Sequence, residues 1–241
     1  PIKEITAQFI RNALVDTESS SVNTYNANVK CLKTLFTAAV KMYKIIPQSP
    51  MDTIELKRHT GKDSLRVLTD DQLRYLLSCV RQNHHFKIYA LISLCAFSGI
   101  RIGECLGLTW DDIDFEKSTI DINKQWNDIA KNKYGFKPCK TQRSYRTIPI
   151  PIAVLDELKE LRLLYPVDTI NNRLFNYRCC NSLSRYAYRY VGDGLHCLRH
   201  TYATRLLSHG VDIKTVAALL GDSVATVLDV YVSYTDDMRK K

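Results

Sequence analysis

Residues 98–113 read SGIRIGECLGLTWDDI, and the organisation of the larger part of the chain can be worked out from this stretch. It follows the apolar run Ile88–Phe97, which is typical of a buried helix. After the Ser-Gly break, Arg101 precedes Glu104 by three residues, a spacing that places both side chains on one helix face. We expect the carboxylate to hold the guanidinium, whereas an ordinary surface ion pair is the simpler alternative.

Helical and extended patterns surround this stretch. Upstream, Thr69-Asp70-Asp71-Gln72 has the form of a capping box and predicts a helix to about Gln82, followed by another from about Phe86 to Phe97. Downstream, Ile120 and Ile122 alternate with polar residues, and residues 147–150 follow a polar hairpin, which predicts a small antiparallel sheet. Helices are then expected over about 153–164, 181–191, 196–208, 212–220 and 223–232, with Gly210 and Gly221 at helix ends.

The N-terminal region, residues 1 to about 56, reads as helix throughout. From Asn23 to Ile46 apolar residues recur at three- and four-residue steps, as on one buried helix face, and Pro47 and Pro50 stop the pattern. The polar segment 57–66 reads as a linker to a second domain, residues 67–241. The predicted fold class is mainly α with a small antiparallel β-sheet.

The composition fits a globular protein of 241 residues, with 45% hydrophobic and 24% charged residues. The net charge of +9 favours a polyanionic partner, nucleic acid or an anionic membrane surface, although it also serves solubility. The apolar run is too short to span a membrane, and the N-terminus carries no signal-peptide pattern. Eight cysteines without a CxxC pair give poor support for a zinc site and suggest reduced thiols in a cytoplasmic protein.

Cationic residues in the second domain are the candidates for chemistry. His196 and Arg199 lie three residues apart, on one helix face, although this spacing alone is common. Lys140 opens a basic hairpin that continues through Arg143 and Arg146 and reads either as a phosphate clamp or as a charged edge strand. The sequence has no phosphate-binding glycine loop and no HExxH motif.

Three segments in order resemble the boxes of the tyrosine recombinases, the phage-type integrase family. They are residues 98–113, the run Leu195–Thr204 (LHCLRHTYAT), and the segment from Leu219-Leu220-Gly221-Asp222-Ser223 to Tyr231; Lys140-Thr141 with residues 146–149 resembles the lysine hairpin of the family. The resemblance covers residues 65–241. The helices before it resemble the later half of a core-binding domain, as in integrases of conjugative transposons, so residues 1–56 are expected to be an N-terminally truncated part of that domain.

The resemblance implies a role for each residue at a matching position. Arg101 and Arg199 would hold the non-bridging oxygens of a phosphodiester, because two guanidiniums can bind them without a metal. Tyr231 would form a 3′-phosphotyrosyl bond, with His196 as base and Lys140 as general acid. Glu104 and Asp222 would support them, and no metal or other cofactor is expected. The expected DNA-binding residues are Lys30, Lys33, Lys41, Arg143 and Arg146.

Two positions depart from the pattern of the family. Asp222 stands where the family usually has His or Trp, and an aspartate can accept a hydrogen bond there but is neither a neutral donor nor a cation. Ser233 replaces a histidine often found two residues beyond the nucleophile. Tyr234 is a competing nucleophile about one turn later, but spacing from the Leu-Gly pair favours Tyr231.

The expected activity is site-specific recombination of double-stranded DNA by an integrase or transposase of a mobile element. Two domains would clamp the duplex, and four protomers would join two duplexes, with an accessory directionality factor as a further partner. Two alternatives remain: a type IB topoisomerase-like strand-passing enzyme, and a DNA-binding regulator with an inactive recombinase fold. Asp222 is the residue that supports the second alternative. A basic RNA-binding protein ranks last because no aromatic stacking motif is present.

Overall fold

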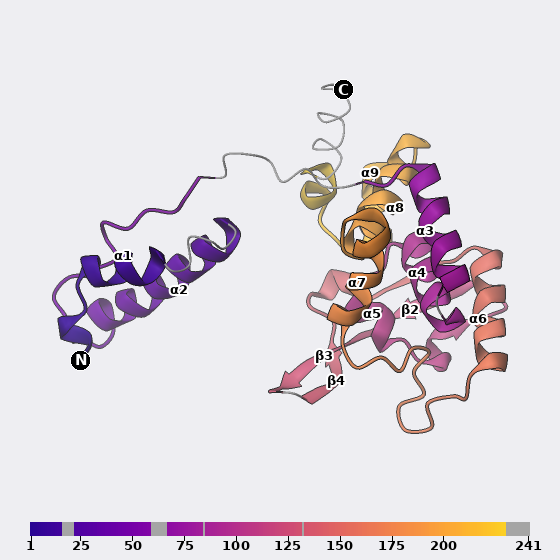
Figure 1. Ribbon diagram of the computed structural model, residues 1–241, viewed down its shortest axis with the longest axis horizontal. Coiled ribbons are helices and arrows are strands. Elements are labelled where there is room, and N and C mark those ends of the chain that lie inside the picture. The colour runs from indigo at the N-terminus through magenta and orange to yellow at the C-terminus, as the bar shows by residue number, and fades with distance from the viewer. Residues whose placement is uncertain (16–21, 59–66, 84, 132, 230–241) are drawn as a thin grey trace. The chain divides into compact units, whose positions relative to one another are not determined.

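The computed structural model describes residues 1–15, 22–58, 67–83, 85–131 and 133–229. The chain divides into two compact units, residues 1–62 and 63–241 (Figure 1). The division lies within the segment 57–66 that the sequence predicts as a linker. In the described ranges, no helix has both the length and the apolar character needed to cross a bilayer.

The described residues of the N-terminal unit form two α-helices. A 3₁₀ turn, η1 (Ile2–Glu4), precedes α1 (Ala7–Val15) and α2 (Val22–Lys41), and the chain after α2 is irregular. The expectation of helix throughout residues 1–56 is therefore wrong for the stretch after Lys41. Apolar side chains of that stretch close the core instead of extending the helix; the core consists of Ile10, Leu14, Val29, Phe36, Ala39, Ile46, Met51 and Ile54.

The end of α2 comes five residues before the predicted one. Lys44 adopts a left-handed backbone conformation, with φ of 49°. The amide of Ile45 then reaches back to the carbonyl oxygen of Ala39 at 2.9 Å, and the amide of Tyr43 reaches that of Ala38 at 3.0 Å. These bonds satisfy carbonyls of the last turn, so the helix ends on its own cap before the chain reaches the prolines.

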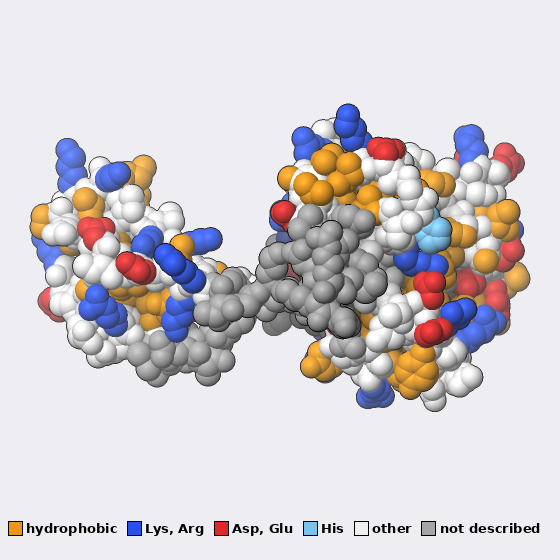
Figure 2. All heavy atoms as spheres, turned by 90° about the horizontal axis from the view of Figure 1, so that it is seen from above, with side chains coloured by type: hydrophobic (Ala, Val, Ile, Leu, Met, Phe, Trp, Pro, Cys, Tyr) orange, Lys and Arg blue, Asp and Glu red, His pale blue; other side chains and the backbone are white. Residues whose placement is uncertain are grey.

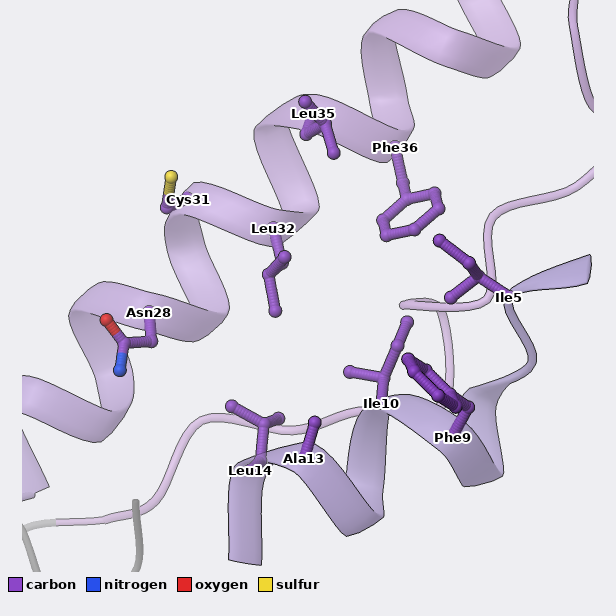
Figure 3. Close-up of a pocket in the computed structure, with 10 residues that line it drawn as sticks. All are labelled: Ile5, Phe9, Ile10, Ala13, Leu14, Asn28, Cys31, Leu32, Leu35 and Phe36. Atoms are coloured by element: carbon purple, nitrogen blue, oxygen red, sulfur yellow. The ribbon is translucent and has the colours of Figure 1, made fainter. Parts of the chain in front are cut away.

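An open apolar groove of about 400 Å³ lies between the two helices. Figure 3 shows Phe9 and Ala13 of α1 facing Leu32 and Leu35 of α2 across it. Phe9 and Leu35 are exposed. This unit therefore presents an apolar face in addition to its core.

The second unit agrees closely with the predicted helices. Thr69 and Gln72 form the predicted capping box: the Gln72 amide donates to Thr69 Oγ1 at 3.2 Å, and the Thr69 amide donates to Gln72 Oε1 at 3.0 Å. Residues 224–229 are also helical, and the rest of the predicted last helix lies outside the described residues. The helices are α3 (Asp70–Asn83), α4 (Phe86–Ser98), α5 (Ile102–Gly107), α6 (Ile152–Leu164), α7 (Cys180–Val191), α8 (His196–Ser208) and α9 (Ile213–Leu220).

Helix α4 is the centre of this unit. Nearly every residue from Ile88 to Ser98 is buried, because α3, α6 and α8 pack around it. Gly99 ends the helix with φ of 64°. A β-carbon there would lie 2.4 Å from Cδ1 of Tyr202, so glycine is required both by the backbone and by space. The turn at Gly99 delivers Arg101 to the start of α5.

In the described part of the chain, two small antiparallel sheets stand in place of the single sheet predicted from the sequence. The first has the order β1 (Ile113–Asp114), β2 (Thr119–Ile122), β5 (Arg146–Pro149), with Ile120 opposite Ile148 as expected from their alternation. The second pairs β3 (Lys124–Ala130) with β4 (Lys133–Pro138) and projects from the unit (Figure 1). Short 3₁₀ turns, η2 (Trp110–Asp112) and η3 (Gln142–Ser144), lead into β1 and β5.

Candidate active site

Arg101 is held at the corner between α4 and α5. It is the N-cap residue of α5, and its backbone amide donates to Oε2 of Glu104 at 3.1 Å. Its Nη1 donates to Oε1 of the same carboxylate at 2.7 Å. The pair expected from the three-residue spacing is thus present, and Glu104 fixes both the backbone and the side chain of Arg101.

Arg199 reaches the same place from α8. Its side chain is only 4% exposed. Nη1 donates to the carbonyl oxygen of Gly99 at 2.7 Å, and Nη2 donates to that of Leu220 at 2.7 Å. A buried guanidinium must have hydrogen-bond acceptors, and backbone carbonyls of two different turns supply them here.

Asp222 joins the two arginines. One of its carboxylate oxygens, Oδ1, accepts from Nη2 of Arg101, and the other, Oδ2, accepts from Nη2 of Arg199 at 2.6 Å. The Asp222 amide is fixed by donation to the carbonyl oxygen of Ala217 at 3.0 Å, directly after the left-handed cap Gly221. Two guanidiniums from distant parts of the chain therefore converge on one anionic group.

Arg146 is buried beside this group, contrary to the expectation that it lies on the DNA-facing surface. Its side chain is 6% exposed. Nε donates to the carbonyl oxygen of Leu219 at 2.7 Å, Nη1 to that of Ser144 at 2.8 Å, and Nη2 to Oε2 of Glu104 at 2.9 Å. These internal partners make Arg146 a support for Glu104.

Glu104 stays ionised although it is buried. Burial pushes the pKa of its carboxyl up, but the hydrogen bond and charge of Arg146, with those of Arg101, outweigh it and lower the pKa. A negative charge in this position holds both arginines in place.

The C-terminal end of α9 organises the site. Three successive carbonyl oxygens at this end accept from three arginines: Leu219 from Arg146, Leu220 from Arg199, and Gly221 from Arg101 at 3.5 Å. The last carbonyls of a helix have no partner within the helix and carry partial negative charge. They are therefore suitable acceptors for cations.

His196 begins α8, one turn before Arg199. Desolvation, with the positive charges of Arg199 and Arg101, lowers the pKa of its imidazole. The ring of His200 packs edge-on against it at 4.7 Å between centroids. Burial and the neighbouring His196 lower the pKa of His200 to about 4. His200 is thus neutral at pH 7, and the lowered pKa of His196 favours its neutral form, which can accept a proton.

The predicted lysine lies in the hairpin that precedes Arg146. Lys140 is exposed, in the turn between β4 and η3. The preceding residue, Cys139, lies within electrostatic reach of the arginine cluster: burial, then the charge of Glu104, raise the pKa of its thiol, and Arg146 and Arg101 oppose them. Arg143 is exposed in the same hairpin. Tyr231 and Tyr234 lie outside the described residues.

The other predicted DNA-binding residues lie on α2 of the N-terminal unit. At 100° per residue, Lys30 and Lys41 are about 20° apart around the helix and Lys33 is about 60° to the other side. They therefore form a stripe, in which Lys30 and Lys41 are exposed and Lys33 is half-buried. Figure 2 shows Lys and Arg side chains spread over this unit.

Sequence reasoning missed three features of the site. The double pairing of Asp222, the internal role of Arg146 and the packing of His200 on His196 all depend on contacts made only in the folded chain. The run Gly221-Asp222 held one signal, because a residue after a C-terminal glycine cap is held close to the end of its helix.

Comparison with known proteins gives the family of this chain. The model of the phage integrase family matches residues 66–238. The chain therefore belongs to the phage integrase family, the tyrosine recombinases, and is a DNA strand-transferring enzyme.

Its relatives carry recombinase names. A XerC-like tyrosine recombinase of Caldanaerobacter subterraneus subsp. tengcongensis is 29% identical over 95% of this chain and 67% of its own length. A tyrosine recombinase of Thermosipho africanus is 25% identical over 91% of this chain and 74% of its own length. Among solved structures, the Tn1549 transposon integrase in complex with circular intermediate DNA has a TM-score of 0.76 at 22% identity, covering 99% of this chain and 86% of that one.

Proposed function

We propose that this protein is a site-specific recombinase, the integrase or transposase of a mobile element, that cleaves and rejoins DNA through a 3′-phosphotyrosyl intermediate. The assignment to a mobile element draws support from the likeness to the Tn1549 transposon integrase, whose fold matches nearly the whole chain.

One observation carries the proposal: Arg101 and Arg199 place Nη2 atoms on the two oxygens of a single anionic group. A phosphodiester attacked by an oxygen nucleophile gathers negative charge on its non-bridging oxygens. Two guanidiniums set in a largely buried site stabilise that charge without reorganising. In this assignment Arg101 and Arg199 bind the scissile phosphate, and Glu104 positions Arg101.

The chemical step exchanges one ester for another. The phenol oxygen of Tyr231 attacks phosphorus, and the bond from phosphorus to the 5′-oxygen breaks. The tyrosine proton passes to neutral His196, and Lys140 gives a proton to the departing 5′-oxygen. A free phenol has a pKa near 10, so roughly 0.1% is ionised at pH 7, and a base is needed. The 5′-hydroxyl of another strand reverses the step and completes the exchange.

Duplex DNA is the proposed substrate. Lys30, Lys33 and Lys41 would contact phosphates from the N-terminal unit, and Arg143 from the lysine hairpin. Affinity would then fall steeply with salt concentration, because each neutralised phosphate releases counterions. Four protomers on two duplexes would carry out the exchange, with an accessory directionality factor setting its direction.

The test uses nicked duplexes of random sequence and a denaturing gel. A nick lets the short 5′-hydroxyl fragment leave, so the covalent adduct accumulates. We expect an adduct in the presence of EDTA that is lost in Tyr231→Phe and kept in Tyr234→Phe. Loss only in Tyr234→Phe would overturn the choice of nucleophile.

The alternatives give different results in the same assay. DNA binding without an adduct would point to a DNA-binding regulator. The result must be the same for this chain and for a chain extended by a preceding core-binding segment. An adduct accompanied by relaxation of supercoiled plasmid, without strand exchange between two sites, would point to a topoisomerase-like enzyme. Strand exchange between two labelled duplexes supports the recombinase.

A further inference from the structure

The carboxylate of Asp222 bridges the two arginines. It is not chelated by one guanidinium but shared, with Oδ1 on Nη2 of Arg101 and Oδ2 on Nη2 of Arg199. Two oxygens of one singly charged group thus meet two separate cations. The two non-bridging oxygens of a phosphodiester, which also carries one negative charge, would have to be bound in the same manner in the function proposed above.

The exposed fractions of the three side chains indicate which of them can leave the cluster and be replaced by another group. Arg199 is 4% exposed, whereas Asp222 is 20% and Arg101 is 32% exposed. Arg199 is also fixed by the carbonyl oxygens of Gly99 and Leu220. The backbone of Asp222 is held by its amide bond to Ala217, so its carboxylate can move away by rotation of the side chain while the arginines stay in place.

The two guanidiniums also need an anion between them. Desolvation and then the positive charge of Arg101 lower the pKa of Arg199, and the hydrogen bond and charge of Asp222 act in the opposite direction. Asp222 therefore relieves a repulsion between two cations that lie close together.

We propose that Asp222 occupies the scissile-phosphate subsite of the DNA-free protein, so that DNA binding exchanges one internal anion for a phosphate. This inference rests on the proposed function, because it assigns the subsite to Arg101 and Arg199. Asp222 is then a positioning residue that keeps both arginines ready and lowers the affinity of the subsite for phosphate. The departure from the usual His or Trp at this position becomes a determinant of phosphate affinity instead of a sign of lost activity.

Inorganic phosphate is the probe that tests this exchange. We compare thermal melting of the full chain with increasing phosphate at constant ionic strength, for the wild type, Asp222→Asn and Asp156→Asn. Asp156 is exposed on α6, and its replacement changes the net charge by the same amount. Without phosphate, we expect Asp222→Asn to melt at a lower temperature than the wild type. With phosphate, Asp222→Asn should reach half of its full rise in melting temperature at a phosphate concentration at least fivefold below that of the wild type. Asp156→Asn should respond as the wild type does.

Two further variants make the test independent of folding defects. Adding Arg101→Gln to Asp222→Asn should abolish the gained response, because one of the two cations is removed. Asp222→His restores a residue usual in the family and should also bind phosphate more tightly than the wild type. A phosphate response of Asp222→Asn and Asp222→His equal to or weaker than that of the wild type would overturn the proposal.

The DNA readout separates this inference from the proposed function. On nicked duplex, Asp222→Asn should lower Kd more than Asp156→Asn does, with no gain in the rate of adduct formation at saturating DNA. If the wild type forms no adduct that depends on Tyr231, the proposed function is wrong. The phosphate comparison still tests whether Asp222 occupies an anion-binding subsite between the two arginines. If the adduct forms and Asp222→Asn binds DNA no tighter than Asp156→Asn, the exchange is refuted.

Discussion

Nη2 of Arg146 donates to Oε2 of Glu104 at 2.9 Å, and Nη1 of Arg101 donates to the other oxygen of that carboxylate at 2.7 Å. Glu104 is therefore shared between a buried arginine from β5 and the half-exposed arginine that faces the site. An i, i+3 ion pair on a helix surface contributes only a few tenths of a kcal/mol. This one belongs to a buried network, in which removing one member leaves a charge without its partner.

Arg146→Gln is expected to destabilise the protein by about 2–4 kcal/mol and to slow adduct formation, because Glu104 loses the partner that fixes it. Urea unfolding and the nicked-duplex assay measure the two effects. Arg143→Gln in the same hairpin is the matched control: it removes the same charge from an exposed position, and its stability should change by less than about 0.5 kcal/mol. Equal stability losses in the two variants would contradict the buried role of Arg146.

Gly221→Ala is expected to cost more stability than Gly210→Ala. Both glycines have positive φ, 67° and 81°, so each substitution carries about 1 kcal/mol of backbone strain. A β-carbon at Gly221 would also lie 2.9 Å from the carbonyl oxygen of Arg143 and 3.0 Å from Nη1 of Arg146, whereas at Gly210 no described residue apart from its chain neighbours lies within 4 Å of a β-carbon. We expect a loss of about 2–4 kcal/mol for Gly221→Ala.

The rate of adduct formation measures the functional effect of the same two substitutions, Gly221→Ala and Gly210→Ala. Gly221→Ala should slow it, because the clash displaces the hairpin that carries Lys140 and Arg146, and Gly210→Ala should leave it close to the wild-type rate. Equal melting temperatures and equal rates for the two variants would show that the hairpin does not depend on close approach at Gly221.

His200 should make stability depend on pH. Its pKa is about 4 in the folded protein and near 6.5 when unfolded, so its contribution is complete above pH 6.5 and is lost as the pH falls toward 4. Because the ring is half-buried, the loss is on the order of 1–2 kcal/mol. Urea unfolding of the wild type and His200→Asn between pH 7 and pH 4.5 measures it. Identical pH slopes for the two proteins would rule out this contribution.

The lysine stripe of α2 should set part of the salt dependence of DNA binding. Replacing Lys30 and Lys41 with Gln removes two phosphate contacts, so the slope of log Kd against log salt should fall by about 2. Fluorescence anisotropy at several salt concentrations gives the slope. The double variant Lys117→Gln, Lys159→Gln loses the same charge from lysines that pair with neighbouring aspartates, and it should keep the wild-type slope.

Local patterns predicted the helices of the second unit well, in part because some of them carry their own start or stop signal. Thr69 with Gln72 starts α3, Gly221 ends α9, and both are observed. The N-terminal unit was predicted less well. A lysine in a left-handed conformation ends α2, and no local pattern marks Lys44 for that role.

The candidate site was predicted in part for a similar reason. The Arg101–Glu104 pair follows from a three-residue spacing, so it could be expected. Asp222 lies 121 residues from Arg101 in sequence, and Arg146 lies 73 residues from Leu219. Such contacts are set by the packing of α9 against α8 and β5, and a single sequence holds no periodicity that reports them. The division into two sheets also depends on packing, because β3 lies against α5.

The three carbonyl oxygens at the end of α9 accept hydrogen bonds from Arg101, Arg146 and Arg199, so one helix end holds all three side chains. A displacement of that helix end therefore reaches all three guanidiniums together. The chain leaves the same helix end through Asp222 toward Tyr231, nine residues further on. In the proposed function, the helix end that holds the phosphate-binding arginines thus leads along the chain to the residue that attacks the phosphate.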